Sequence, residues 1–291
     1  MDDRYLQGRH FLKSNWQLVK DTVSDQSKGL PTPPQELPPE SDDSVVALPP
    51  VEEVYREGAA TGASAAEAPG MLAAAAPAPP AAIEVAPLLG AAPIGAAPIL
   101  HRLLKNRKSR RSFRGSPLSL AQLSYLLWSC EGVRENRGKF SFRTTPSGGA
   151  RHPLDVYVFA RRIDDLKPGL YRYLPIEHSL VLEREGDDSE ALNEALMDQL
   201  RNSSCVIFWA AVPYRSEWRY GKAADKLVAL DAGHSCQNLY LACEALGLGT
   251  CAVGAYDQKK LDAYLGLDGE DMFAMYAAPV GRPVHKEAQE E

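Results

Sequence analysis

The chain has 291 residues and a formal net charge of -6, and its charges are unevenly distributed. Its first hundred residues hold 14 of the 22 prolines and 13 acidic against 6 basic side chains, so the rest of the chain is close to neutral. A near-neutral globular part lacks the basic excess of nucleic-acid binders, and we therefore expect no nucleic-acid partner.

The cysteines and the apolar segments indicate a compartment. Five cysteines form no C-x-x-C pair, and an odd number cannot all pair with one another, which favours reduced thiols. The longest apolar stretch, residues 68 to 100, is interrupted by seven prolines and cannot form a regular membrane helix. The chain opens with mixed polar residues rather than with a secretory signal. These features predict a cytoplasmic protein without a membrane partner.

Composition divides the chain into three regions. Residues 1 to 58 are predicted to form an extended Pro-rich leader, because LPTPP and LPP favour polyproline-like backbone that could wrap a surface. Residues 59 to 100 form an Ala/Pro-rich insert that buries too little to offset the entropy of ordering, so we expect it to be flexible. Residues 101 to 291 have the composition of one globular domain.

The globular region mixes predicted helices and strands. Leucines at helical spacing after Ser119, a candidate N-cap, predict a core-facing helix over residues 119 to 129. Short apolar runs rich in β-branched and aromatic residues predict buried strands at 154 to 160 and 205 to 212. GLYRY and HSLVL predict a two-stranded ribbon, and helical periodicity follows over residues 190 to 200.

The longest predicted element is a single helix over residues 220 to 246, closed by Gly247. Gly233 in its middle lowers helix propensity and therefore favours the close approach of another group. Two further strands are predicted at residues 251 to 256 and 272 to 280. Because helices and strands mix without a βαβ repeat, the sequence favours an α+β layer sandwich over a doubly wound fold.

Three motifs carry candidate chemistry, and the first is KNRKSRRSFR at residues 105 to 114. Guanidinium groups crowded around serine hydroxyls suit a phosphate, because they donate bidentate, charge-assisted hydrogen bonds. A solvated basic run or a nucleic-acid patch is the alternative interpretation.

The other two motifs are rich in small residues. In TPSGGARHP, at residues 145 to 153, Gly148 and Gly149 let backbone amides approach a flat or anionic ligand, although a plain tight turn is the simpler interpretation of this motif alone. In GLGTCAVGAY, Gly254 and Ala255 have too little side chain to block a ring lying against their backbone. Close strand packing explains the second motif equally well.

Together with GLYRY, RYGKAADKL and the terminal VGR, these motifs resemble the nitroreductase superfamily, most closely its SagB-type dehydrogenase or azoline-oxidase branch. The resemblance covers residues 101 to 283, and GRHFLKSNW near the N-terminus is similar to the leader of some stand-alone members. It implies a three-layer αβα sandwich with a central, mainly antiparallel sheet. It also implies a homodimer that binds FMN at the subunit interface, where the long helix lies.

The resemblance also implies roles for individual residues, and it implies no metal site. The cofactor-binding residues would be Arg110, Arg111, Ser112 and Arg114 at the FMN phosphate and ribityl chain, Pro146, Ser147, Gly148 and Gly149 along one edge of the isoalloxazine, and Gly254 and Ala255 near flavin N5 and O4. A downstream basic phosphate ligand would be Arg282 or Lys286.

The chain departs from the family pattern at two places. Ala150 stands where typical nitroreductases carry asparagine, which favours the SagB-type branch. Arg219 and Tyr220 stand where azoline oxidases have a Lys-Tyr pair, and a permanently protonated arginine cannot act as a base, which argues against azole formation. We take both as the candidate catalytic residues, with Tyr220 as proton donor or acceptor. Asp231 and His234 are interpreted as structural hydrogen-bonding groups.

These observations predict an FMN-dependent oxidoreductase that moves two electrons as a hydride through flavin N5. Its substrate would be a small organic or peptide-derived molecule, with NADH and NADPH as candidate electron donors. An NAD(P)H-dependent nitro or quinone reductase is one alternative, and a flavin-binding or scaffold protein without turnover is another.

Overall fold

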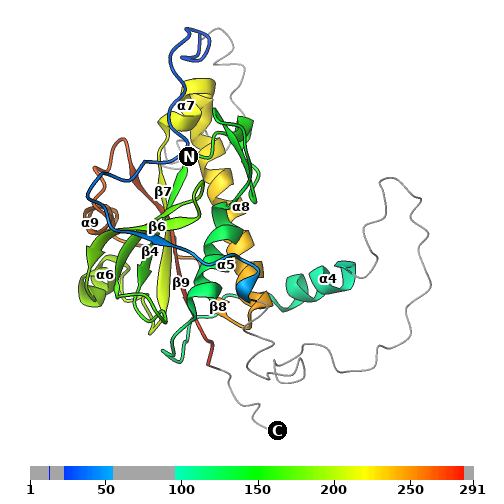
Figure 1. The fold of residues 1–291 in the computed structure, drawn as a ribbon, viewed down its shortest axis with the longest axis vertical. Coiled ribbons are helices and arrows are strands. Elements are labelled where there is room, and N and C mark those ends of the chain that lie inside the picture. Colours follow the sequence, from blue (N-terminus) through cyan, green and yellow to red (C-terminus); the bar gives the residue numbers. More distant parts are fainter. Residues whose placement is uncertain (1–12, 14–22, 55–95, 285–291) are drawn as a thin grey trace, which may run out of the picture.

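The computed structural model describes residue 13 and residues 23–54 and 96–284 (Figure 1). Most of the GRHFLKSNW motif and most of the insert lie outside these residues. The prediction that the insert is flexible therefore concerns residues that the structure does not describe. Lys286 also lies outside the described residues.

A seven-stranded sheet forms the middle of the domain, and its strand order is β1-β6-β5-β4-β7-β9-β8. Every neighbouring pair in it is antiparallel. The strands of this sheet are β1 (Val45–Ala47), β4 (Leu154–Ala160), β5 (Gly169–Leu174), β6 (Ser179–Glu185), β7 (Cys205–Ala211), β8 (Gly249–Thr250) and β9 (Phe273–Gly281). A separate hairpin joins β2 (Val133–Asn136) to β3 (Ser141–Arg143).

Helices cover both faces of the sheet and make three layers (Figure 1). Helices α5 and α8 pack on one face and α6 and α9 on the other; their bounds are Leu120–Glu131, Ala224–Ala245, Ser189–Ala195 and Gln258–Leu265. Successive side chains of β4 alternate between the layers, because Val156 and Val158 join the core under α5 and α8, whereas Tyr157 and Phe159 join the core on the other face. The predicted α+β class and mainly antiparallel, three-layer sandwich are confirmed.

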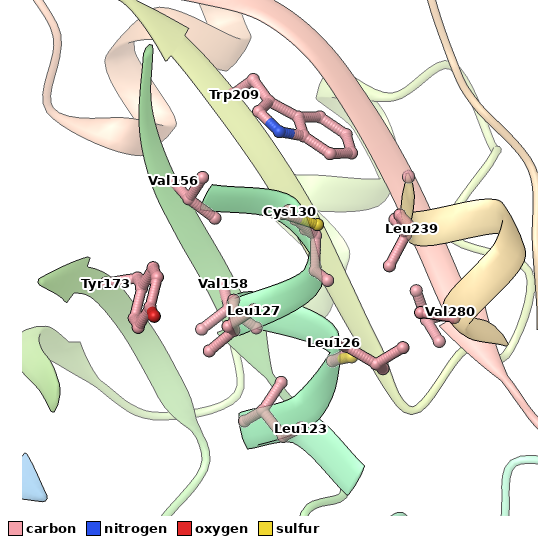
Figure 2. Close-up of a cluster of buried hydrophobic side chains, with 14 of the residues drawn as sticks. Leu123, Leu126, Leu127, Cys130, Val156, Val158, Tyr173, Trp209, Leu239 and Val280 are labelled. Atoms are coloured by element: carbon pink, nitrogen blue, oxygen red, sulfur yellow. The ribbon is translucent and has the colours of Figure 1, made fainter. Parts of the chain in front are cut away.

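Helix α5 begins where the sequence predicts. The Ser119 hydroxyl accepts a hydrogen bond from the Gln122 amide at 3.1 Å, and the Gln122 side chain accepts one from the Ser119 amide at 3.2 Å. This reciprocal pair is a capping box. Figure 2 shows Leu123, Leu127 and Cys130 of α5 among the buried side chains that face the strands. All five cysteines are buried and unpaired, as expected of reduced thiols.

The predicted helix over residues 220 to 246 is wrong at its N-terminal end. A short helix, α7 (Tyr214–Tyr220), and a 3-10 turn (Gly221–Ala223) precede α8, which begins only at Ala224. Gly221 has a φ of 50° and a ψ of -137°, so the chain leaves the helical region there. The predicted C-terminal end is confirmed, since Gly247 follows α8 with a φ of 65°. The break places Arg219 and Tyr220 at the end of a separate helix.

Two other elements are shorter than predicted. Helix α6 ends at Ala195, and the residues after it include Met197 and Asp198 with φ values of 52° and 62°, which a right-handed helix excludes. The strand predicted over residues 251 to 256 is reduced to an isolated bridge between Val253 and Ala277, beside the two-residue β8. The irregular path leaves Gly254 and Ala255 exposed.

Residues 23–54, named the leader strap here, lie along the globular domain (Figure 1). The Gln26 amide donates to the Trp218 carbonyl of α7 at 2.9 Å. Further along the strap, β1 pairs with β6 and becomes the edge of the sheet, and the Ser124 hydroxyl of α5 donates to the Pro49 carbonyl at 2.6 Å. The strap therefore contacts α7, the sheet edge and α5 in turn.

Helix α4 (Ala96–Asn106) crosses the boundary that composition places at residue 100, and the sequence pattern did not predict it. Ile99, Leu100 and Leu104 on this helix are each about half exposed, so it presents apolar side chains to solvent in the single chain. Over the part of the chain that the structure describes, no helix combines the length and apolar character needed to cross a membrane.

Candidate active site

The first candidate half-site is basic and is built where the segment before α5 meets the end of β9. The Val284 amide donates to the Ser112 carbonyl at 3.0 Å, and the Arg114 amide donates to the Arg282 carbonyl at 2.9 Å. Buried Phe113 bridges to Pro283 between these bonds. The backbone thus brings together two segments that are far apart in sequence, and we name Arg110, Arg111, Ser112, Arg114 and Arg282 the basic half-site.

Arg110 is held against the C-terminal end of α8. Its guanidinium makes a bidentate ion pair with the Glu244 carboxylate, at 2.5 and 3.1 Å, and both side chains are largely buried. Because Glu244 occupies two of its donors, Arg110 offers a ligand only its remaining N–H groups. Arg111, Ser112 and Arg114 are exposed to solvent.

Tyr240 of α8 links the basic half-site to the small-residue segment after β8. Its hydroxyl accepts from the Ala252 amide at 2.8 Å and lies 3.0 Å from the Ser109 hydroxyl. The Arg110 amide donates to the Thr250 carbonyl at 2.9 Å. Gly254 follows this segment and lies beside Tyr276 of β9, so the candidate N5 backbone continues from the residues that contact Arg110 and Tyr240.

The second candidate half-site is the loop before β4 together with the end of α7. Gly149 has a φ of 60°, and a Cβ built there would overlap the Tyr220 hydroxyl and lie 3.1 Å from Cδ of Arg219. A Cβ on Gly148 would lie 3.2 Å from the Leu227 side chain of α8. The structure therefore places residues 146–149 against Arg219 and Tyr220, and we name this group the loop half-site.

We expect Gly149→Ala to lower turnover roughly 10- to 100-fold, because the new methyl group would displace the Tyr220 hydroxyl and small misplacements of reacting groups are costly. Gly138→Ala is the matched control, since Gly138 also has a positive φ but a Cβ there meets nothing within 4 Å. Steady-state kinetics and urea unfolding of both variants separate misplacement from backbone strain. Equal turnover in the two variants would contradict the proximity of Gly149 to reacting groups.

A buried carboxylate supports the loop half-site from α8. The Ser147 hydroxyl donates to Asp231 at 2.5 Å and accepts from the His152 amide at 2.9 Å. Burial raises the pKa of Asp231 to about 6, against the opposing hydrogen bond from Ser147. Asp231 thus hydrogen-bonds to the loop, and His234 is exposed on α8.

The raised pKa of Asp231 predicts a pH-dependent stability. Between pH 3.8 and about 6 the folded chain binds a proton at Asp231 that the unfolded chain releases, so this group lowers the free energy of unfolding as pH rises through that window. Two pKa units correspond to at most roughly 3 kcal/mol. Urea unfolding across this range should show that the free energy of unfolding of Asp231→Asn increases relative to that of the wild type as pH rises. A difference that stays constant with pH would contradict the shift.

The two half-sites lie near opposite ends of α8. The loop contacts Leu227 near the N-terminal end, whereas Arg110 pairs with Glu244 at the C-terminal end. Seventeen residues separate these positions, which is roughly 25 Å at 1.5 Å per residue. One chain therefore assembles the residues of each half-site, but it does not bring the two half-sites close to each other.

A buried ion pair fixes the position of α7 and hence of Arg219 and Tyr220. The Arg215 guanidinium of α7 donates to both oxygens of Asp155 on β4, at 2.6 and 3.0 Å, and both side chains are almost fully buried. Sequence reasoning missed this pair, as it missed Glu244 and Tyr240. The signal was present, because an acidic residue inside the apolar run LDVYVFA requires a partner.

The three-layer, mainly antiparallel sandwich defines an α+β class of protein, and the family match places it among the oxidoreductases. The chain belongs to the nitroreductase family, since the sequence model of the family described as "Nitroreductase family" matches residues 104–282. The predicted family resemblance is thereby confirmed. In residues 23–54 and 96–284, no group of three or more His, Cys, Asp or Glu side chains is placed to hold a metal ion.

Three similar proteins illustrate the relationship. A Methanocaldococcus jannaschii protein assigned to the nitroreductases is 34% identical over 187 residues, which are 64% of this chain and 91% of that protein. The trifolitoxin-processing protein TfxB of Rhizobium leguminosarum bv. trifolii is 30% identical over 152 residues, 50% of this chain and 41% of TfxB. A solved Ralstonia eutropha structure assigned to the nitroreductases has a TM-score of 0.57 and 26% identity, covering 88% of this chain and 99% of that one.

Proposed function

We propose that the chain is an FMN-dependent oxidoreductase that carries out two-electron transfer on a small organic or peptide-derived substrate. The observation that carries this proposal is the pairing of residues 112–114 with 282–284, which gathers Arg114, Arg282 and an exposed serine hydroxyl at one end of α8. Guanidinium groups and a hydroxyl are the donors that a phosphate accepts best. The family relationship supports the same reading.

The donors of the two half-sites fit FMN. Arg110, Arg111, Ser112, Arg114 and Arg282 would hold the phosphate and ribityl chain, while the exposed backbone of Gly254 and Ala255 would lie near N5 and O4. Residues Pro146, Ser147, Gly148 and Gly149 would line the other edge of the ring. Bound FMN would supply two-electron hydride chemistry at its N5 atom.

A homodimer would complete the site, because the half-sites lie at opposite ends of α8 in one chain. If α8 crosses its copy in an antiparallel manner, the basic half-site of one subunit meets the loop half-site of the other. The solvent-facing side of α8 supports this arrangement. Leu230, Gly233, His234 and Gln237 are exposed there, and Gly233 sits mid-helix with no atom within 4 Å of a built Cβ.

Gly233→Trp should yield a folded monomer that no longer retains FMN. The new side chain has space in the single chain, but it would block the close crossing of two α8 helices. Lys259→Trp is the matched control, because Lys259 is an exposed residue of α9 and the new ring lies on the other face of the sheet. Size-exclusion chromatography with absorbance detection measures both properties. A dimeric, flavin-loaded Gly233→Trp protein would rule out this interface.

The chain's own residues have distinct tasks in this proposal. Tyr220 is the proton donor or acceptor at the ring edge, since its hydroxyl is the atom nearest to a Cβ built on Gly149. Arg219 provides a fixed positive charge, because arginine stays protonated at neutral pH. Asp231 positions Ser147 through their short hydrogen bond.

Anaerobic reduction tests the proposed activity. Protein loaded with FMN is mixed with NADH, NADPH or an organic donor, and bleaching of the flavin spectrum is followed. Transfer to a substrate is then measured by adding a nitroaromatic or quinone acceptor. Flavin that no donor reduces and no acceptor reoxidises would leave only the alternative of a flavin-binding scaffold without turnover.

Two similarities favour different substrates within this function. The 34% identity to the Methanocaldococcus protein favours an NAD(P)H-dependent nitro or quinone reductase, which is the second candidate. The similarity to TfxB, whose name states a role in processing trifolitoxin, favours a SagB-type dehydrogenase acting on a peptide-derived substrate. The site would operate in the cytoplasm in both cases.

A further inference from the structure

A cavity of about 630 Å³ opens beside the loop half-site, bounded by α7, the β2–β3 hairpin and the leader strap. Its lining combines aromatic rings with cationic side chains, chiefly Phe140, Phe142, Trp218, Arg134, Arg151 and Arg219. None of the described lining residues is Asp or Glu. A cavity with apolar walls and a few convergent charged groups is the usual form of a small-molecule site.

Two of the arginines are oriented without a carboxylate partner among the described residues. The Arg151 guanidinium lies 5.3 Å from the centre of the Trp218 ring, and its Nε donates to the Gly149 carbonyl at 3.2 Å. The Arg219 guanidinium lies 5.5 Å from the centre of the Tyr220 ring. By contrast, Arg143 on the same cavity wall is paired with the Glu131 carboxylate at 3.4 Å.

Arg151 and Arg219 also act on each other. Burial, and then the positive charge of Arg219, lowers the pKa of Arg151. Two nearby guanidinium groups of like charge are relieved by an anion placed between them, and their planar forks match the two oxygens of a carboxylate. In the proposed dimer the arginines of the basic half-site hold the flavin phosphate, so Arg151 and Arg219 remain for a second anion.

We propose that this cavity is the substrate subsite and that Arg151 and Arg219 bind a carboxylate carried by an aromatic or peptide-derived substrate. The assignment rests on the proposed function, because it takes the loop half-site as the place of the flavin ring. It gives the fixed positive charge of Arg219 a substrate-binding task.

The leader strap completes the subsite. Gln26 and Thr32 of the strap line the cavity. The strap also holds Trp218 at two points, because the Gln26 amide donates to its carbonyl at 2.9 Å and its indole Nε1 donates to the Leu30 carbonyl at 3.1 Å. Since Arg151 stacks on this ring, the strap fixes the carboxylate-binding group as well as the wall.

Direct binding tests the subsite without requiring turnover. Isothermal titration compares 4-nitrobenzoate with its methyl ester, which differ in charge but share the ring. Wild-type protein should bind the acid at least about ten-fold more tightly, as a charge-assisted hydrogen bond predicts, and Arg151→Gln should lose this preference. Arg137→Gln is the control, because Arg137, in the β2–β3 hairpin that bounds the cavity, is exposed and already paired with Glu135. Arg151→Lys should restore part of the preference.

Equal affinity of the wild type for acid and ester would overturn the proposal, and so would an unchanged preference of Arg151→Gln for the acid. Tighter binding of inorganic phosphate than of 4-nitrobenzoate would also overturn it, because the site would then belong to a phosphate-bearing donor. Reoxidation of dithionite-reduced holoprotein by the same two acceptors should show the same preference, and Arg151→Gln should lower the rate with the acid more than the rate with the ester. A protein that never takes up FMN would refute the proposed function, while the titration would still decide the carboxylate site.

Discussion

Replacing Arg110 and Arg114 together by alanine should weaken FMN binding by roughly two to four orders of magnitude. Each charge-assisted hydrogen bond to a phosphate is worth roughly 1.5 to 3 kcal/mol, and the double variant removes two of the four arginines of the basic half-site. The fold should persist, because both residues lie outside the two core clusters. Fluorescence titration with FMN and circular dichroism measure the two effects.

Two controls give this result its meaning. Glu244→Ala breaks the same ion pair as Arg110→Ala but keeps the guanidinium, so it should retain FMN. Lys108→Ala removes one exposed positive charge from the same basic run and should also retain it. Comparable FMN loss in Glu244→Ala would show that the ion pair stabilises the local structure, and the phosphate assignment of Arg110 would then fail.

Arg215→Met should lower the free energy of unfolding by roughly 3 to 5 kcal/mol, the usual cost of removing one partner of a buried ion pair. The substitution leaves the Asp155 carboxylate buried, with 4% of its side-chain surface exposed and no counterion. Because the pair joins α7 to β4, the variant should also lose the fixed position of Arg219 and Tyr220. Urea unfolding and turnover at low temperature, where the variant remains folded, measure both losses.

Arg161→Met provides the comparison for this prediction. Arg161 pairs with Asp187 at 3.3 Å, but the Asp187 side chain is 45% exposed, and such surface pairs contribute about 0 to 1 kcal/mol. The two variants make the same chemical change at a buried and an exposed pair. A loss in Arg215→Met no larger than that in Arg161→Met would contradict the structural role of the buried pair.

Local signals in the sequence predicted most of the fold. The β4 bounds follow from an apolar run, and the start of α5 follows from Ser119 as an N-cap before leucines at helical spacing. The prediction of one helix over residues 220 to 246 failed because helical spacing continues through Gly221, whose backbone conformation depends on how α7 packs. Spacing alone cannot report such a break.

The candidate site was only partly predictable. Motifs identified the residues at each half-site, but the pairing of Arg114 with Arg282 joins positions distant in sequence, and only the sheet topology brings them together. Spacing also gave no sign that the Glu244 carboxylate would accept hydrogen bonds from the Arg110 guanidinium. Nor did it indicate that the leader strap would line a cavity beside Arg219. Long-range contacts of this kind are set by packing rather than by local pattern.

The most direct test of the central claim is the flavin content of the purified chain. After incubation with FMN and gel filtration, the account predicts a yellow protein with the two visible bands of oxidised flavin, one FMN per subunit and a dimeric elution volume. A colourless protein that releases no FMN after denaturation, although its circular dichroism shows a folded chain, would contradict the account.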